Sequence, residues 1–425
     1  MIEHAGILLG FAVFFGLVMA FAVGANDVAN AMGTSIGSGA ITMNQAIVIA
    51  MVFEALGAII ASGQVTNTIG RDLISYTQFV SHPEILALGM ISALLSSGLW
   101  LLIASYFGWP VSTTHTIIGA VIGFAGICFG ADFVNWSVVT NIVLSWFLTP
   151  AIAGLLAYAL FKSVHVLVLD HKDPLLRAKF VVPVYVFIVA FVVSIVTLKL
   201  GLKPLGLILD NLTVLMGACV FSLVVTFAAY LWLRFKYHNL QSGSLTDSYK
   251  QVERYFGLLT VITACAMAFA HGSNDTANAI GPVATVVNIV HYGSNFVHSH
   301  VLPFWVVLMG AIGLSLGLAI FGYRVINTVG KNITSLTPTR GFVAQLSTAS
   351  VVVVSSGYGL PVSTTQVLVG ALLGVGLARG IGAINLRVVR NIFLSWLVTL
   401  PAGAVLAIII FYTLAYVLGI SIMPV

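Results

Sequence analysis

Apolar stretches about 20 residues long recur along the whole of this chain and decide its fold class. A helix needs about 20 residues to cross the roughly 30 Å of hydrocarbon in a bilayer. The clearest stretches are 5–24, 41–63, 85–106, 138–161, 180–200, 205–233, 252–270, 301–322, 341–357 and 391–418. They are too long for the strands of an outer-membrane barrel and lack its period-two alternation. We therefore expect an all-α polytopic membrane protein with about 12 membrane segments.

The composition excludes a soluble domain, because 60% of the residues are hydrophobic and only 7% are charged. The first stretch has no basic residue before it, only Glu3 and His4, so we interpret it as a retained span rather than a signal peptide. Cys128, Cys219 and Cys265 are isolated in apolar surroundings and indicate neither a disulfide framework nor a metal site.

The net charge of +5 comes from connecting segments rather than from one face, which argues against a nucleic-acid partner. The basic residues gather around two loops, with Lys162, Lys172, Arg177 and Lys179 at one and Arg234, Lys236, Lys250 and Arg254 at the other. The positive-inside rule places both loops in the cytoplasm. The localisation that follows is the inner (plasma) membrane, with several spans.

The chain contains an internal repeat with a period of about 250 residues. "FAVGANDVANAMG" at 21 returns as "FAHGSNDTANAIG" at 269, and "PVSTTHTIIGAVIG" at 110 returns as "PVSTTQVLVGALLG" at 361. "NIVLSWFLT" at 141 matches "NIFLSWLVT" at 391, and "TNTIGR" at 66 more loosely matches "INTVGK" at 326. The predicted units are a first repeat at 1–161, a two-span connector at 162–250 and a second repeat at 251–425.

The charges of equivalent loops indicate that the two repeats are inverted. The segment after the first PVSTT, "FAGICFGADFVNWSVVT", has no Lys or Arg, whereas its second-half equivalent carries Arg379, Arg387 and Arg390. Equivalent loops of opposite basic content face opposite sides of a membrane. Both termini are then expected outside the cytoplasm, and the substrate site of such a secondary transporter lies near the midplane between the repeats.

The repeated Asn-Asp motif brings oxygen atoms to one side of a helix. Asp27 and Asn30 are three residues apart, and Asn26 and Asn30 are four apart. The second copy repeats this arrangement with Asn274, Asp275 and Asn278. Carboxylate and amide oxygens suit a hard cation, with Na⁺ preferred here. The alternative is that the small residues serve helix packing and that the Asn side chains join neighbouring helices.

The PVSTT motif predicts a helix start, because Pro110 and Pro361 each follow a Gly-rich break and suit the first turn. The hydroxyls that follow would join free N–H groups in an anion site at the helix N-terminus. Two copies facing each other could enclose a tetrahedral oxyanion; the hydroxyls are those of Ser112, Thr113, Thr114, Ser363, Thr364 and Thr365. Alternatively, the hydroxyls only cap the helix or bond back to its carbonyls.

Charge balance favours a cation that enters with the anion. The motifs contain no Lys or Arg, while Asp27, Glu54 and Asp275 lie in apolar segments near them. Two like charges about 5 Å apart repel by about 3 kcal/mol even at an effective dielectric of 20. Glu54 has no acidic counterpart at 308–313 and is expected to be a cation or proton site, or else a buried neutral carboxyl. His115, whose counterpart is Gln366, is expected to be structural.

The duplicated ND-x-A-N-A signature and the paired PVSTT hairpins resemble the inorganic phosphate transporter (PiT) family over about 1–160 and 251–425. That family includes sodium- and proton-coupled phosphate symporters and some sulfate permeases. The resemblance implies two inverted repeats with re-entrant helical hairpins. It supports Asn26, Asp27, Asn274 and Asp275 as core site residues, Glu54 as the family's acidic position, and the six hydroxyls as oxyanion contacts. The short connector indicates a prokaryotic member.

The sequence thus predicts Na⁺-coupled symport of inorganic phosphate, without a cofactor other than the coupling ion. The alternative within the class is an H⁺-coupled phosphate or sulfate permease. An enzyme is not expected, because no nucleophile with a nearby base is present. A channel for anions would favour Lys or Arg along a pore, which the motifs lack. A homodimer is compatible with the sequence.

Overall fold

The computed structural model describes residues 4–201, 209–236, 245–298, 301–332, 336–380 and 386–422. Helices make up nearly all of this part of the chain, and its only strand-like pairing is an isolated bridge between Ile74 and Val134. Helices satisfy their backbone hydrogen bonds within one segment, as a chain in hydrocarbon requires. Nine of the described helices are long and apolar enough to cross a membrane. The predicted all-α membrane fold is confirmed.

The first repeat is built from six α-helices. They are α1 (Ala5–Gly37), α2 (Met43–Ala61), α3 (Gly63–Asn67), α4 (Pro83–Tyr106), α5 (Thr113–Ile122) and α6 (Trp136–Val164). The connector contributes α7 (Pro174–Val196) and α8 (Asn211–Lys236). The second repeat has α9 (Leu245–Asp275), α10 (Ala277–Tyr292), α11 (Phe304–Asn332), α12 (Pro338–Gly357), α13 (Thr364–Arg379) and α14 (Leu386–Leu418). The predicted boundaries at 161 and 251 fall close to helix ends and stay a prediction.

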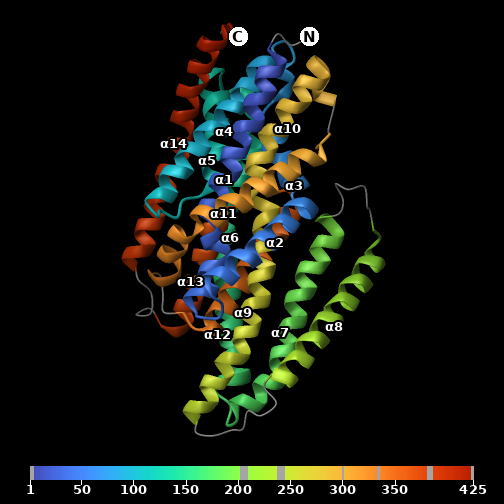
Figure 1. Cartoon of the computed structure of the whole chain (residues 1–425), viewed down its shortest axis with the longest axis vertical. Helices are drawn as coiled ribbons and strands as arrows, with labels where there is room; N and C mark the ends of the chain where they lie inside the picture. The colour runs from blue at the N-terminus through green and yellow to red at the C-terminus, as the bar shows by residue number, and fades with distance from the viewer. Residues whose placement is uncertain are drawn as a thin grey trace.

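The two repeats cross the molecule in opposite directions (Figure 1). The chain enters α1 at the end where both termini lie, whereas α9 begins at the far end. That far end also holds the turn between α6 and α7, where the Tyr249 hydroxyl at the start of α9 donates to the Leu169 carbonyl at 3.0 Å. Helices α7 and α8 stand as a pair beside the rest of the bundle. The described helix ends that flank the two basic loops, on α6, α7, α8 and α9, therefore share one end, opposite both termini.

Close helix contacts occur in equivalent pairs, which shows that the repeats are related by an approximate two-fold rotation. A methyl group at Gly24 would overlap the Leu314 carbonyl, where α1 crosses α11. A methyl group at Gly272 would overlap the Glu54 carbonyl, where α9 crosses α2. Because Gly24 and Gly272 are equivalent, the structural counterpart of Glu54 is Leu314. It lies one residue beyond the 308–313 window, and it is not acidic either.

The two PVSTT segments form the predicted re-entrant elements. A tight turn separates α4 from the short helix α5, and the same turn separates α12 from α13. Gly108 and Gly359 occupy equivalent places in these turns with φ of +68° and +73°. This left-handed backbone favours glycine. Ser112 and Ser363 are the N-caps, and their hydroxyls accept from the backbone N–H of His115 and Gln366.

Candidate functional site: the buried centre between the repeats

The motifs predicted from the sequence converge at the centre of the protein. Asp27 lies in the second half of α1, and Asp275 is the last residue of α9 before a one-residue interruption at Thr276. None of the thirteen predicted site residues is more than 3% exposed. The structure therefore brings both Asn-Asp motifs, both hydroxyl clusters and Glu54 into one buried region.

Each Asn-Asp motif bonds to the hydroxyl cluster of the other repeat. The Asn30 amide donates to Thr365 Oγ1 at 2.8 Å and to Thr364 Oγ1 at 3.3 Å. The Asn278 amide, from the second repeat, donates to Thr113 Oγ1 at 3.3 Å and to Thr114 Oγ1 at 3.5 Å. Sequence reasoning placed these groups near one another, and only the structure reveals that they pair across the repeats.

The starts of α5 and α13 meet at the same place. The Thr114 hydroxyl donates to the Val362 carbonyl at 3.1 Å, and the Thr365 hydroxyl donates to the Val111 carbonyl at 3.3 Å. Two positive helix ends thus lie side by side in the centre. Ser112 and Ser363 take part through their capping bonds, at 3.1 and 3.4 Å.

The two central carboxylates have different partners. Asp275 accepts from the Thr364 hydroxyl at 2.8 Å and from the Thr114 hydroxyl at 3.4 Å. Asp27 Oδ1 accepts from the Asn30 amide at 3.0 Å. Among the described residues, Asp27 Oδ2, Asn26 Oδ1 and Asn278 Oδ1 receive no hydrogen bond although they are buried. Such uncommitted oxygens are suitable ligands for a hard cation.

Asn26 and Asn274 anchor the site to the turns that precede α5 and α13. The Asn26 amide donates to Ser105 Oγ at 3.1 Å and to the Trp109 carbonyl at 3.0 Å. Asn274 pairs with Ser356 Oγ at 2.9 Å in either orientation of its amide. Each of these side chains therefore fixes a helix–turn junction within its own repeat.

A histidine that the sequence analysis did not single out joins the three acids. His271 Nδ1 lies 2.9 Å from Glu54 Oε1, and His271 Nε2 lies 2.9 Å from Asp275 Oδ2 and 4.0 Å from Asp27 Oδ2. His271 and Glu54 are fully buried. Glu54 thus reaches the centre through His271, from α2.

The other repeat has an apolar pair at the places equivalent to Glu54 and His271. His271 corresponds to Val23 in the repeated motif, and Glu54 corresponds to Leu314 at the helix crossing. Both Val23 and Leu314 are fully buried. Comparing the two copies position by position would have exposed His271, because it is an ionisable residue where its copy has valine.

A protonated His271 makes the centre less negative, but the net charge of the centre stays negative. When all three carboxyls are ionised, the centre carries a net charge of −2 even if the histidine is protonated. One ligand atom each from Asp27, His271 and Asp275 can be chosen within 4.8 Å of one another, close enough to hold a metal ion. The imidazole of His271 suits a transition metal, whereas the carboxylate and amide oxygens of the centre suit a hard cation. Because oxygen ligands predominate, Na⁺ is the better match. His115, by contrast, lies outside this cluster, in a groove between α6, α13 and α14.

Comparisons with known proteins agree with this architecture. The model of the phosphate transporter family matches residues 23–407. A Haemophilus influenzae protein named as a phosphate permease is 53% identical over 412 residues, covering 97% of this chain and 98% of that protein. The Arabidopsis thaliana chloroplastic inorganic phosphate transporter 2-1 is 40% identical, covering 95% of this chain and 71% of that protein.

A solved structure has the same fold. The structure titled "The sodium-dependent phosphate transporter" superposes with a TM-score of 0.90 at 38% identity, covering 97% of this chain and all of that one. The likeness includes both repeats and the connector, and it places the chain among transporters rather than enzymes. By sequence and by structure, the chain belongs to the phosphate transporter family.

Proposed function

We propose that this chain carries inorganic phosphate across the cytoplasmic membrane together with Na⁺. The observation that carries the proposal is the buried centre, where uncommitted oxygens lie beside two helix N-termini and four threonine hydroxyls. The solved sodium-dependent phosphate transporter of the same fold supports the choice of ions.

In this proposal, the anion binds at the starts of α5 and α13. The positive helix ends and their N–H groups attract an oxyanion. The hydroxyls of Thr113, Thr114, Thr364 and Thr365 would donate to it, and Ser112 and Ser363 would hold the helix starts in shape. In the present state three of these hydroxyls donate to protein oxygens. Phosphate would therefore replace bonds that already exist.

The cations bind at the Asn-Asp motifs. Asp27 and Asp275 supply charge, while Asn26, Asn30, Asn274 and Asn278 supply or position amide oxygens. A centre with net charge −2 repels an anion, since like charges about 5 Å apart cost about 3 kcal/mol each at an effective dielectric of 20. Na⁺ binding removes that repulsion, so phosphate follows Na⁺. The repeats then expose the site to one side of the membrane at a time.

The second candidate is proton coupling, in a phosphate or sulfate permease. The pair formed by Glu54 and His271, 2.9 Å apart, favours it, because both side chains can exchange a proton. In the Na⁺ proposal, Glu54 is a further cation ligand or a support for His271.

Binding of Na⁺ and phosphate to the purified protein tests the site without a membrane. Asp27→Asn and Asp275→Asn should each weaken Na⁺ binding at least about tenfold, which is a loss of about 1.4 kcal/mol or more. Phosphate binding should weaken with it when titrated calorimetrically in Na⁺. Asp170→Asn, on an exposed connector side chain, is the matched control and should change neither affinity. Wild-type Na⁺ and phosphate affinities in both central variants would refute the assignment.

A further inference from the structure

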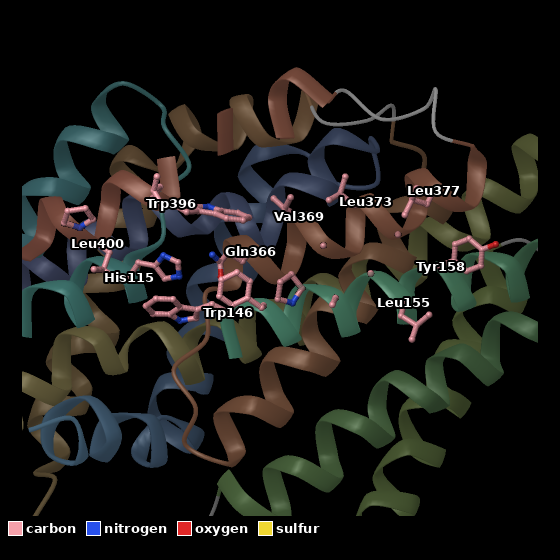
Figure 2. A pocket seen from close by; sticks show the side chains of 18 residues that line it. His115, Trp146, Leu155, Tyr158, Gln366, Val369, Leu373, Leu377, Trp396 and Leu400 are labelled. Carbon is pink, nitrogen blue, oxygen red and sulfur yellow. The ribbon is translucent and has the colours of Figure 1, made fainter. Parts of the chain in front are cut away.

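An apolar groove of about 930 Å³ runs along the outside of the bundle between α6, α13 and α14. Figure 2 shows His115, Trp146, Gln366 and Trp396 gathered at one end of it and Tyr158 and Leu377 at the other. The volume is in the range of sites for small molecules. The groove is separate from the carboxylate centre and has no part in the function proposed above.

The inner end of the groove is polar and closed. His115, Trp146, Gln366 and Trp396 are all more than nine-tenths buried there. No described residue forms a hydrogen bond with Gln366 Oε1 or with Trp146 Nε1. His115 comes close to the Gln366 side chain and the Trp396 backbone, but neither of its nitrogens has a partner of normal hydrogen-bond geometry. Buried polar atoms of this kind are costly unless a partner reaches them.

The walls of the groove are apolar and face the lipid. Phe147 and Leu155 on α6 and Leu397 on α14 are each more than 70% exposed on helices long enough to span a membrane. No Lys, Arg, Asp or Glu is among the lining residues. A molecule in the groove would therefore arrive from the bilayer and carry no charge, since nothing along the walls would balance one.

The polar end of the groove lies deep in the membrane and the groove extends from it toward Tyr158, which makes an ordinary phospholipid a poor fit. Trp146 and Tyr158 are twelve residues apart on α6, or about 18 Å along a helix. Trp146 is ten residues into a helix of 29, so the polar end lies well inside the hydrocarbon. A phospholipid keeps its polar head at the interface and would bring only a methyl end to the unpartnered polar atoms.

We propose that this groove binds an uncharged, membrane-dissolved amphiphile whose carbonyl or hydroxyl group reaches Gln366 and Trp146 and whose apolar body extends toward Tyr158. Trp146 Nε1 and the Gln366 amide are donors for such a group, and Gln366 Oε1 is an acceptor for a hydroxyl. Leu373 and Leu377 on α13, with Leu155 on α6, enclose the apolar body.

The position of this site gives it a route to the centre of the protein. His115 directly follows Thr114 in α5, and Gln366 directly follows Thr365 in α13. A molecule bonded to Gln366 therefore acts directly on α13, and it lies beside His115 of α5, so it rests close to both helices that carry the threonine hydroxyls.

Photolabelling with 4-dodecylbenzophenone tests the proposal, because this neutral probe reacts at its ketone. Irradiation of the purified full-length chain in liposomes, followed by peptide mass spectrometry, should place the label around Trp146 and Gln366. Trp146→Phe and Gln366→Leu should each lower that labelling about fivefold to tenfold, as expected for one lost hydrogen bond. Labelling spread over the lipid-facing surfaces of α7 and α8 at the same level would overturn the proposal.

A pair of tryptophan variants supplies the matched control. Leu155→Trp fills the groove and should abolish labelling at its polar end. Val405→Trp, at the equivalent exposed place on α14, lies outside the lining residues and should leave labelling unchanged. Equal labelling in both variants would show that the probe does not occupy the groove. If wild-type protein in the same liposomes is a dimer that shields the groove from the probe, the occupant is a second copy and the proposal is wrong.

Discussion

His271 is the residue that most changes the interpretation of the centre. It contacts Glu54 and Asp275 at 2.9 Å each, so an acid on α2 and an acid on α9 are linked through one imidazole. In the other repeat, Val23 is equivalent to His271, and Leu314, at the equivalent helix crossing, corresponds to Glu54. One fold therefore accommodates either an ionisable pair or an apolar pair at equivalent positions.

Exchanging the ionisable pair for the apolar one tests whether it serves stability or transport. His271→Val alone leaves the buried Glu54 carboxyl without its partner, and Glu54→Leu alone leaves His271 Nδ1 without one, although Nε2 keeps Asp275. The loss of Glu54's partner should cost about 3–5 kcal/mol, and the loss at Nδ1 should cost less. The double variant copies Leu314 and Val23 and should recover most of that loss. Thermal unfolding of the detergent-purified proteins measures the stability difference.

Transport by the stable double variant then separates the two roles. We expect it to lose cation-driven phosphate uptake, because Glu54 and His271 are part of the charged centre. Wild-type uptake by the double variant would mean that the pair is structural. Single variants as stable as the wild type would contradict the contacts themselves.

Sequence reasoning found the acids and missed the histidine for a physical reason. The Asn-Asp and PVSTT motifs are visible because both copies keep them. His271 has no histidine counterpart in the first copy, and its partner Glu54 lies on a distant helix, α2. The close contacts of Gly57 and Gly272 where α2 crosses α9 bring the two residues together, and the sequence does not show that crossing. The pairing of Asn30 with Thr365, across repeats, also depends on tertiary packing that no local pattern encodes.

Helix crossings hold the centre together through glycines. Where α9 crosses α2, a methyl group at Gly272 would overlap the backbone carbonyl of Glu54, and one at Gly57 would overlap that of Phe269. Close approach through small residues is a common way for helices to pack in membranes. The ionisable pair therefore depends on how closely α2 and α9 approach.

Gly272→Ala should separate α2 from α9 and destabilise the protein. The added methyl group meets backbone atoms that cannot move aside, and overpacking of this kind typically costs about 1–3 kcal/mol or more. Gly257→Ala on the same helix has no atom within 4 Å of the added methyl group and is the matched control. It should be neutral or stabilising by up to about 1 kcal/mol. Similar thermal unfolding of the two variants would show that the crossing is not tight.

The arrangement of the whole bundle follows from the duplication and the loop charges. Both termini lie at one end, and the turn between α6 and α7 and the start of α9 lie at the other (Figure 1). The sequence predicted the hairpins and the inverted repeats because motif order survives in both copies while equivalent loops differ in their content of Lys and Arg. The inner-membrane location, the extracytoplasmic termini and a homodimer stay predictions.

Site-directed labelling tests the orientation. In a variant in which Cys128, Cys219 and Cys265 are replaced by alanine, Ser421→Cys introduces an exposed thiol at one end and Asp173→Cys a half-buried thiol at the other. A membrane-impermeant maleimide added to intact cells should label residue 421 and leave residue 173 unlabelled until the membrane is opened, because basic loops stay in the cytoplasm. The reverse pattern would invert the topology.

The central claim is that phosphate crosses the membrane only with Na⁺. The most direct measurement is uptake of radiolabelled phosphate into proteoliposomes under an inward Na⁺ gradient, a pH gradient or neither, with choline replacing Na⁺ and with excess sulfate as competitor. We predict accumulation above the equilibrium level with Na⁺ alone and little inhibition by sulfate. Accumulation driven by the pH gradient without Na⁺, or abolished by sulfate, would contradict the account and favour a proton-coupled or sulfate permease.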